Sequence, residues 1–391
     1  MHCNTLAFLF GGNSMQKKLL IVMLMGMPHV LLAHHGFGRF DMNGEISLSG
    51  TLTSLEFVNP HSYVYFDVTL EDGSVREMGC EMRAATVLRR SGWSPDMFTP
   101  GVQVNITGRP HRDDPTSCYV ETLALGDAPV LERYQQLEEG SQQDAADRPE
   151  RLTSGEPNIS GDWAQEQYLL ATLPDGSSAG LVPKSRVTAI ENGDAAPGDF
   201  SNNGWAPRPV TLTALGEAAS ERLRNQPPRE NPRIACEITN ILFDWVFDGP
   251  INRISQAADR IVLEYGRDLV RTVDMSATAH PEYYELSRRG HSIGHWHGDV
   301  LVVDSIGFLP GRMAGNVPHS NRLHVVERFM LETDDLGRLT LKRQFRAEDP
   351  VYFVDAYLGE DTLLLADAPF AVDECKELAF EYTEGSASGA P

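Results

Sequence analysis

Histidines gather in one stretch of the second half of the chain. In GHSIGHWHGD, residues 290–299, His291, His295 and His297 occupy alternate positions. Because alternate side chains of a β-strand share a face, we expect all three imidazoles on one side of a strand. The H-x-H pair formed by His295 and His297 has a spacing that zinc and copper sites use. This pair is a candidate metal site, and exposed or hydrogen-bonded histidines beside a tight turn are the alternative.

Histidine and carboxylate side chains are also the groups that most often act in acid–base catalysis. The segment VVDSIGF places Asp304 in the middle of a strand, where a buried carboxylate needs a partner or a shifted pKa. PHS places His319 in a loop, and RLHVVERF places His324 on a further strand. The candidate catalytic residues are therefore His291, Asp304, His319 and His324.

Two charged residues, Glu327 and Arg328, follow His324 on the same predicted strand. His324 and Arg328 share strand parity, whereas Glu327 points to the opposite face. Glu327 and Arg328 are interpreted as surface charges on a strand. The sequence has no phosphate-binding loop, dinucleotide fingerprint, H-E-x-x-H or C-x-x-C motif, and no spacing forces a serine–histidine nucleophile.

The beginning of the chain predicts an export signal. From Met15 the sequence reads MQKK and then LLIVMLMGMPHVLLA, a basic start followed by an apolar run too short to span a membrane. We expect a secretory signal over residues 1–33, with Met15 as the true initiator and cleavage after Ala33.

Cleavage at that position would make His34 the amino-terminal residue. Its α-amine and imidazole could then chelate one metal together, and a further imidazole would give an all-nitrogen site of the kind that suits copper. His61, in FVNPHSYVYF, is the candidate for that ligand, and His35 is its rival. The sequence thus predicts a copper or zinc site at His34, His35 and His61. An ordinary cleavage site followed by a polar terminus is the alternative.

Composition limits the partners and the compartment. The formal net charge of −22 disfavours nucleic acid or an anionic membrane as a partner. We expect a periplasmic or secreted protein, off the membrane once the signal is removed, that binds a small molecule or a metal ion. Four cysteines follow the signal and allow three pairings. Cys80–Cys118 and Cys236–Cys375 are favoured because each pair falls within one expected domain, and a free catalytic thiol is the alternative.

The first expected domain, residues 34–127, has strand periodicity broken by turns. Five segments have strand character: ISLSGTLTSLEFV, SYVYFDVTL, VREMGCEM, VQVNITGRP and CYVETLALG. AATVLRRSGW, after the third, has the spacing of a short helix. The order β-β-β-α-β-β predicts a small OB-like five-stranded barrel. Residues 128–158 are polar and rich in Gly, Ser and Pro, which indicates a linker.

The second expected domain, residues 159–383, is a larger barrel with one helix. That amphipathic helix covers residues 210–228 and is capped near Thr213. Eight strands are then predicted from INRISQ, IVLEY, LVRTVDM, HSIGHW, VLVVDSIGF, RLHVVERFML, RLTLKRQF and TLLLA. Short strands joined mostly by tight turns predict an antiparallel meander closed into a barrel. GDW at 161–163 resembles the G-x-W that opens lipocalin-like barrels. The fold class is mainly β, and residues 384–391 are predicted to be a disordered tail.

Residues 34–127 also resemble a family of small secreted domains of unknown function. Its members run HH-x-F, then NPH and then R-R-G-W. The matching residues here are His34, His35, Phe37, Asn59, Pro60, His61, Arg89, Arg90, Gly92 and Trp93, with Ser91 inserted.

From about residue 230 the chain resembles a second uncharacterised family, of secreted bacterial proteins. Its core runs HP, GHSIG-x-W-x-GD-x-LVVD-x-x-GF, PHS-x-x-LHVVER and DP. The matching residues are His280, Pro281, His291, Asp304, His319, Ser320, His324, Glu327, Arg328, Asp349 and Pro350. Relatives usually carry Lys or Arg, then Glu, where this chain has His295 and His297. The resemblance therefore shifts weight from the H-x-H pair to the candidate catalytic residues, and neither family has a known reaction.

These observations leave three functions open. The first is a binding protein that holds a metal at His34 and His61, a small apolar ligand in the larger barrel, or both. The second is a hydrolase, lyase or isomerase that uses the candidate catalytic residues, in the cavity of the larger barrel, on a small hydrophobic or cyclic substrate. The third is a structural module. A filled barrel interior would count against the enzyme, because catalysis needs a cavity.

Overall fold

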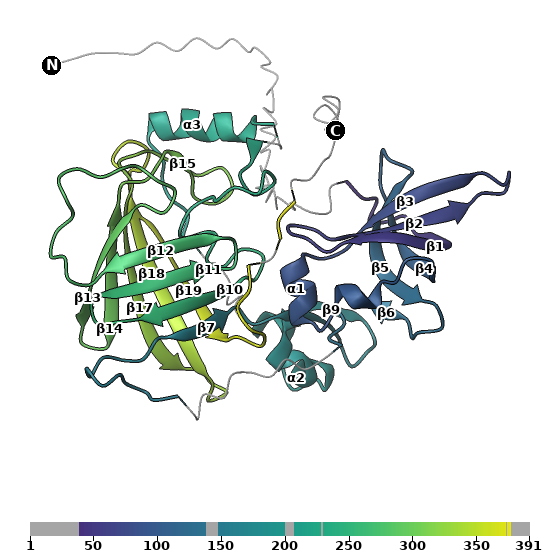
Figure 1. Ribbon diagram of the computed structural model, residues 1–391, viewed down its shortest axis with the longest axis horizontal. Helices are drawn as coiled ribbons and strands as arrows, with labels where there is room; N and C mark the ends of the chain where they lie inside the picture. Colours follow the sequence, from purple (N-terminus) through teal and green to yellow (C-terminus); the bar gives the residue numbers. More distant parts are fainter. Residues whose placement is uncertain (1–38, 138–147, 200–206, 228–229, 373, 377–391) are drawn as a thin grey trace, which may run out of the picture. The chain divides into compact units, whose positions relative to one another are not determined.

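The computed structural model describes residues 39–137, 148–199, 207–227, 230–372 and 374–376 of the 391-residue chain. Figure 1 shows a smaller β-structure, early in the chain, and a larger one that follows it. The smaller is a barrel of five strands with a sixth strand at its edge, and the larger is a closed barrel of nine strands. The predicted mainly β fold, with a small OB-like barrel before a larger one, is therefore confirmed.

A disulfide lies across the closure of the smaller barrel. The barrel strands are β1 (Ile46–Glu56), β2 (Tyr63–Thr69), β3 (Val75–Glu81), β4 (Gln103–Pro110) and β5 (Ser117–Leu125). They lie in the order β3-β2-β1-β4-β5, and a parallel pairing of β3 with β5 closes the ring. Cys80 and Cys118 are opposite each other in that pairing and are bonded, which confirms the first predicted disulfide.

Short elements surround these strands. The predicted helix after β3 is α1 (Ala85–Arg90), followed by the 3-10 helix η1 (Pro95–Met97), and β6 (Leu131–Glu132) extends the sheet beyond β5. The alternating pattern of the strands sends apolar side chains such as Leu52 and Phe66 into a buried core.

All eight predicted strands of the larger barrel are present. They are β10 (Ile251–Gln256), β11 (Arg260–Tyr265), β12 (Leu269–Asp274), β13 (His291–His297), β14 (Val300–Ile306), β17 (His324–Thr333), β18 (Leu339–Glu348) and β19 (Tyr357–Leu365). A ninth, β7 (Gly161–Ala164), pairs with both β10 and β19 and closes the ring, and it carries the buried Trp163 of the GDW segment. The prediction of a wholly antiparallel meander is wrong at one place: β12 and β13 run parallel. The chain between them, residues 275–290, is long enough to return to the end at which β12 began.

Among the described residues that follow β7, four short strands and two helices lie outside the nine-stranded barrel. β8 (Tyr168–Thr172) and β9 (Ser178–Pro183) form a hairpin that packs with α2 (Val187–Glu191), beside the 3-10 helices η3 (Lys184–Arg186) and η4 (Pro197–Asp199). β15 (Gly311–Arg312) pairs with β16 (Pro318–His319). The predicted amphipathic helix is α3 (Ala214–Arg224), and Figure 1 shows it across one end of the barrel, near β15. The Thr213 side chain caps it by accepting from the Gly216 amide, as the sequence predicted.

A segment between α3 and β10 enters the larger barrel and helps to fill it. Ile241 and Trp245 belong to the same buried cluster as the inward-facing side chains of the strands. The Trp245 ring packs edge-on against Tyr265 and Phe329, with centroid separations of 5.1 and 5.9 Å. Because protein cores are close-packed, this filling counts against a ligand or an active site inside the barrel.

Charged side chains are also buried in this interior. Arg343 Nη2 lies 2.6 Å from Asp361 Oδ2, and its Nη1 lies 3.2 Å from Glu327 Oε1. The second Glu327 oxygen pairs with Arg271. Glu327 is 0% exposed, so its interpretation as a surface charge is wrong. Its strand parity, opposite to that of the exposed Arg328, turns it into the barrel, where two guanidinium groups balance its charge.

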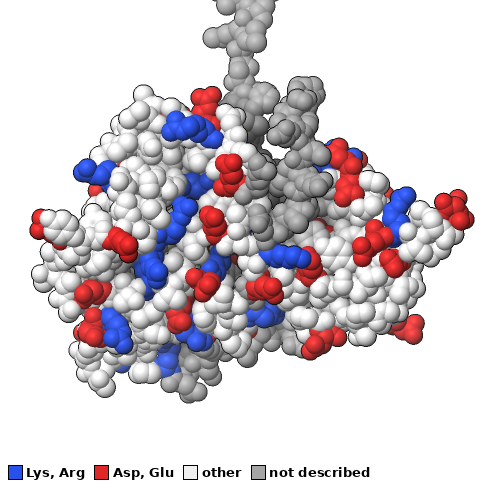
Figure 2. Space-filling view, turned by 45° about the horizontal axis from the view of Figure 1, so that its top comes forward, with Lys and Arg blue, Asp and Glu red and all other residues white. Residues whose placement is uncertain are grey.

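The second predicted disulfide, Cys236–Cys375, is also present. Within the described residues, no helix is long and apolar enough to cross a membrane. On the face in Figure 2, acidic and basic side chains are interspersed, so the net negative charge does not form one continuous patch there. The predicted signal at 1–33 with its start at Met15, the tail at 384–391 and residues 138–147 of the predicted linker lie outside the described residues.

Candidate acid–base site

Three neighbouring strands of the larger barrel each place one candidate residue on its outer face. His291 begins β13, Asp304 lies in β14 and His324 begins β17. Their neighbours Ser292, Ser305 and Val325 are buried and point inward, so strand alternation turns the three candidates outward. In the register His291 pairs with Ile306 and Asp304 with Val326, so the three candidates lie diagonally to one another across the sheet.

A fourth residue, His280, joins the three into one hydrogen-bonded chain. Asp304 Oδ1 lies 2.9 Å from His324 Nε2 and 3.0 Å from His280 Nε2. His280 Nδ1 lies 2.8 Å from His291 Nδ1, with the two rings edge to face. His280 comes from the 275–290 connection, so the long crossover between β12 and β13 brings this residue back onto the barrel wall. The hydrogen bonds connect the four side chains in the order His291, His280, Asp304, His324.

The hydrogen bonds of this chain fix which nitrogens remain free. An ionised Asp304 only accepts, so both facing Nε2 atoms must carry protons. A neutral His280 then has a bare Nδ1, which accepts the Nδ1–H of His291. That arrangement leaves His291 Nε2 and His324 Nδ1 as the nitrogens not used within the chain. Each is able to accept a proton.

The two outer imidazoles have opposite pKa shifts. The hydrogen bond to Asp304 raises the pKa of His324 above its ordinary 6.5. Burial, with a further contribution from the nearby His280, lowers the pKa of His291 below 6.5. Burial raises the pKa of Asp304, but the hydrogen bonds from His324 and His280 outweigh this effect and hold it below its usual value. Near neutral pH, His291 is therefore the better base and His324 the better acid.

The remaining catalytic candidate, His319, lies elsewhere. It sits in β16, is 3% exposed, and its Nδ1 lies 3.3 Å from the Ser320 carbonyl oxygen. Its Nε2 is buried without a hydrogen-bond partner among the described residues. Burial lowers the pKa of His319 to about 4, so the imidazole is neutral at pH 7. The neighbouring Ser320 hydroxyl donates to Asp349 Oδ1 at 2.9 Å.

The metal candidates are also separated. His295 and His297 both point outward from β13 and are exposed. His61 lies in the smaller barrel, where its Nδ1 is 3.1 Å from Glu81 Oε1 and burial lowers its pKa. His34 and His35 lie outside the described residues. Among the residues that the structure describes, no group of three or more His, Cys, Asp or Glu side chains is arranged to hold a metal ion. The copper or zinc site stays a prediction.

His280 was absent from the catalytic candidates predicted from the sequence. Strand periodicity cannot locate it, because it lies in a connection with no regular structure. Its only signal was its place in the HP motif of the C-terminal resemblance. The connection between β12 and β13 brings His280 to Asp304, and the path of that connection depends on tertiary contacts.

Comparison with known proteins bears on the smaller barrel. Residues 23–119 match the model of a family of unknown function (DUF6152), which is the kind of family that the first resemblance implied. The match covers less than half of the chain and ends before the larger barrel, so the second resemblance stays a prediction. No curated protein and no solved structure matches the chain. The chain is therefore similar, over its smaller barrel, to a family that carries no known activity.

Proposed function

We propose that this protein is an acid–base enzyme whose active site lies on the outer face of the nine-stranded barrel. The observation that carries the proposal is the carboxylate of Asp304 held between two imidazole Nε2 atoms, at 2.9 and 3.0 Å. The two disulfides favour an oxidising compartment, which agrees with the predicted export to the periplasm or beyond.

His291 is the base and His324 the acid in this proposal. His291 Nε2 takes a proton from the substrate, and the resulting positive charge is stabilised through His280 by Asp304. His324, when protonated, keeps its Nε2–H on Asp304 and donates its Nδ1–H to the substrate. One proton is taken and one is given, so the pair can serve an isomerase, a lyase or a hydrolase. Asp304 and His280 act as positioning residues, because their contacts are to the two imidazoles.

Apolar side chains border the site and favour a small hydrophobic or cyclic substrate. Ile293 and Val326 pair with Asp304 on either side in the sheet and share its outward face. Asp304 and His324 are 35% and 38% exposed at their side chains, so a substrate can reach them from solvent. The site therefore does not depend on the filled interior of the barrel.

The test uses the processed protein and a panel of esters, lactones and cyclic ketones with acidic α-protons. For the substrates that turn over, His291→Asn and Asp304→Asn should each lower kcat/KM by about 100-fold or more. His297→Asn is the matched control, because His297 shares the strand and the outward face of His291 but lies outside the hydrogen-bonded chain. The pH profile of kcat/KM should be bell-shaped, with its lower limb below 6.5 from His291 and its upper limb above 6.5 from His324. Equal activity of His291→Asn and His297→Asn would overturn the proposal.

A second function, copper binding at the mature amino terminus, has one supporting observation. The imidazole of His61 has a carboxylate, Glu81, at 3.1 Å from its Nδ1, and metal-binding histidines usually have a carboxylate, a carbonyl or a water near their second nitrogen. His34 or His35 would supply the other ligands. Protein that begins at His34 should bind about one Cu(II), and one extra residue before His34 should abolish binding. Unchanged affinity in the extended protein would contradict this proposal.

A further inference from the structure

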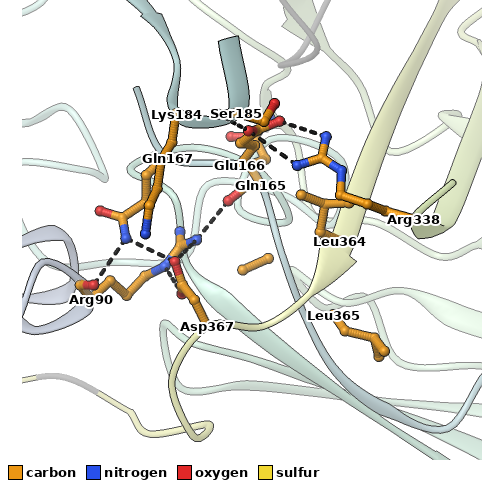
Figure 3. A pocket seen from close by; sticks show the side chains of 11 residues that line it. Arg90, Gln165, Glu166, Gln167, Lys184, Ser185, Arg338, Leu364, Leu365 and Asp367 are labelled. Carbon is orange, nitrogen blue, oxygen red and sulfur yellow. Dashed lines mark hydrogen bonds and ion pairs between the residues drawn. The ribbon is translucent and has the colours of Figure 1, made fainter. Parts of the chain in front are cut away.

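A cavity lies at the end of the larger barrel where β7 and β19 meet, away from the acid–base site. Its volume is about 380 Å³, which is in the range of small-molecule pockets. Figure 3 shows side chains reaching it from Arg90 of α1, from the 165–167 connection, from the start of η3 and from Arg338. Ala164, Leu364 and Leu365 give it an apolar wall. The cavity thus combines charged groups with a short stretch of carbon surface.

Four of the five charged groups around this cavity neutralise one another. Arg338 Nη2 lies 3.0 Å from Glu166 Oε2 and its Nη1 lies 3.2 Å from Glu166 Oε1. Arg90 Nε lies 2.8 Å from Asp367 Oδ1, and Gln167 Nε2 donates to Asp367 Oδ2 at 2.8 Å. These two ion pairs leave neither carboxylate available as a partner for a further cation.

Lys184 is the charge that remains. Its ammonium group makes no hydrogen bond or ion pair with any of the described residues. Figure 3 shows its side chain running beside Gln167, on the side of the cavity that carries the Arg90–Asp367 pair. The next residue, Ser185, has a buried hydroxyl oxygen with no hydrogen-bond partner among the described residues, while its amide donates to Glu166 Oε1 at 2.7 Å. Adjacent residues therefore supply an ammonium group and a hydroxyl group that are both unpaired at one cavity.

We infer that this cavity binds a small monocarboxylate with a short apolar chain. Lys184 and Ser185 supply a charge-assisted and a neutral hydrogen bond to the carboxylate, and Leu364 and Leu365 contact the chain. The net charge of the lining side chains is one positive unit, so one negative charge balances it. A buried hydroxyl without a partner costs free energy, and a bound carboxylate oxygen removes that cost.

The test measures binding of hexanoate to the full processed protein by titration calorimetry. Wild-type protein should bind one equivalent with a Kd of about 1 mM or tighter, and hexan-1-ol and hexylammonium should bind at least about tenfold more weakly. Lys184→Met keeps the aliphatic stem and removes the charge, and should weaken hexanoate binding by about tenfold or more. Ser185→Ala should weaken it by about threefold.

The matched control is Lys342→Met, which removes a surface lysine that is already close to Glu332 and Glu360. It should bind hexanoate as the wild type does. The inference is overturned if hexanoate does not bind, if Lys184→Met binds it unchanged, or if Lys342→Met weakens it equally. It is also overturned if inorganic phosphate binds more tightly than hexanoate, because the apolar wall would then contribute nothing.

Discussion

The inner and outer faces of β14 and β17 carry opposite kinds of polar chemistry. On the inner face, Glu327 and Ser305 belong to a fully buried network with Arg271. On the outer face, Asp304 and His324 belong to a half-exposed chain of imidazoles around one carboxylate. Asp304 and Ser305 are consecutive residues, so strand alternation alone separates the two environments.

The difference lies in how completely the hydrogen-bonding groups are used. Arg343 donates to Asp361 and Glu327, and to the carbonyl oxygens of Ile241 and Leu242 in the segment that fills the barrel. Its donors are committed to holding the interior together. The outer chain leaves one nitrogen of each terminal imidazole unused. We conclude that the inner network stabilises the barrel, while the outer chain retains groups that can react.

Removing a charge from the inner network should have the largest effect. Arg343→Met leaves Asp361 and Glu327 buried with less positive charge to balance them, and should lower the free energy of unfolding by about 3–5 kcal/mol. Urea denaturation at pH 7 measures this change. Arg346→Met is the matched control on the outer face of the same strand, where Arg346 pairs with Glu348 and is 54% exposed. It should cost less than about 1 kcal/mol. Equal costs for the two variants would contradict the assignment of the inner network to stability.

The buried His319 should respond to pH in the opposite sense to the outer His324. Burial holds the pKa of folded His319 at about 4, whereas the unfolded chain takes up that proton near 6.5. Between these values the unfolded state binds more protons, so stability should be highest above pH 6.5 and fall by about 3 kcal/mol as the pH drops to about 4. His319→Asn should lose this contribution.

The comparison of wild type with His319→Asn isolates the effect from other groups. Burial raises the pKa of Asp244 to about 6, which favours folding at low pH and partly opposes His319. Asp244 is present in both proteins, so the difference between their unfolding free energies against pH reports His319. Parallel curves between pH 4 and 7.5 would rule out the buried, neutral His319.

Strand periodicity explains why much of this architecture could be predicted. Alternation in GHSIGHWHGD predicts one face for His291, His295 and His297, and the predicted strands HSIGHW and VLVVDSIGF form a hairpin. Both disulfides followed from keeping each pair within one domain. The same reasoning could not find the ninth strand, because GDWA has only four residues and its pairing depends on β10 and β19.

The inner network and the role of His280 could not be predicted from the sequence, for a related reason. A glutamate in a strand is normally exposed, and only partners on β12 and β18 make a buried Glu327 tolerable. Arg343 lies on the next strand, but Arg271 lies on β12, far from Glu327 in the chain. His280 likewise depends on a crossover whose path no local pattern specifies. Local periodicity predicts which face a residue occupies, and tertiary contacts decide what that face is used for.

The smallest effect should come from removing the carboxylate of the outer chain. Asp304→Asn takes away the negative charge that raises the pKa of His324, so that pKa should fall to 6.5 or below, as measured by NMR titration of the imidazole C2 proton. A raised histidine pKa adds stability that is complete below pH 6.5 and is lost as the pH rises through the folded value. The substitution should therefore lower the free energy of unfolding more at pH 5.5 than at pH 8. The difference should be less than about 1 kcal/mol, because both side chains are more than a third exposed. His297→Asn should leave the pKa of His324 unchanged. An unaltered pKa of His324 in Asp304→Asn would show that Asp304 does not influence this histidine. The outer face would then not differ from the inner face in the reactive role proposed for it.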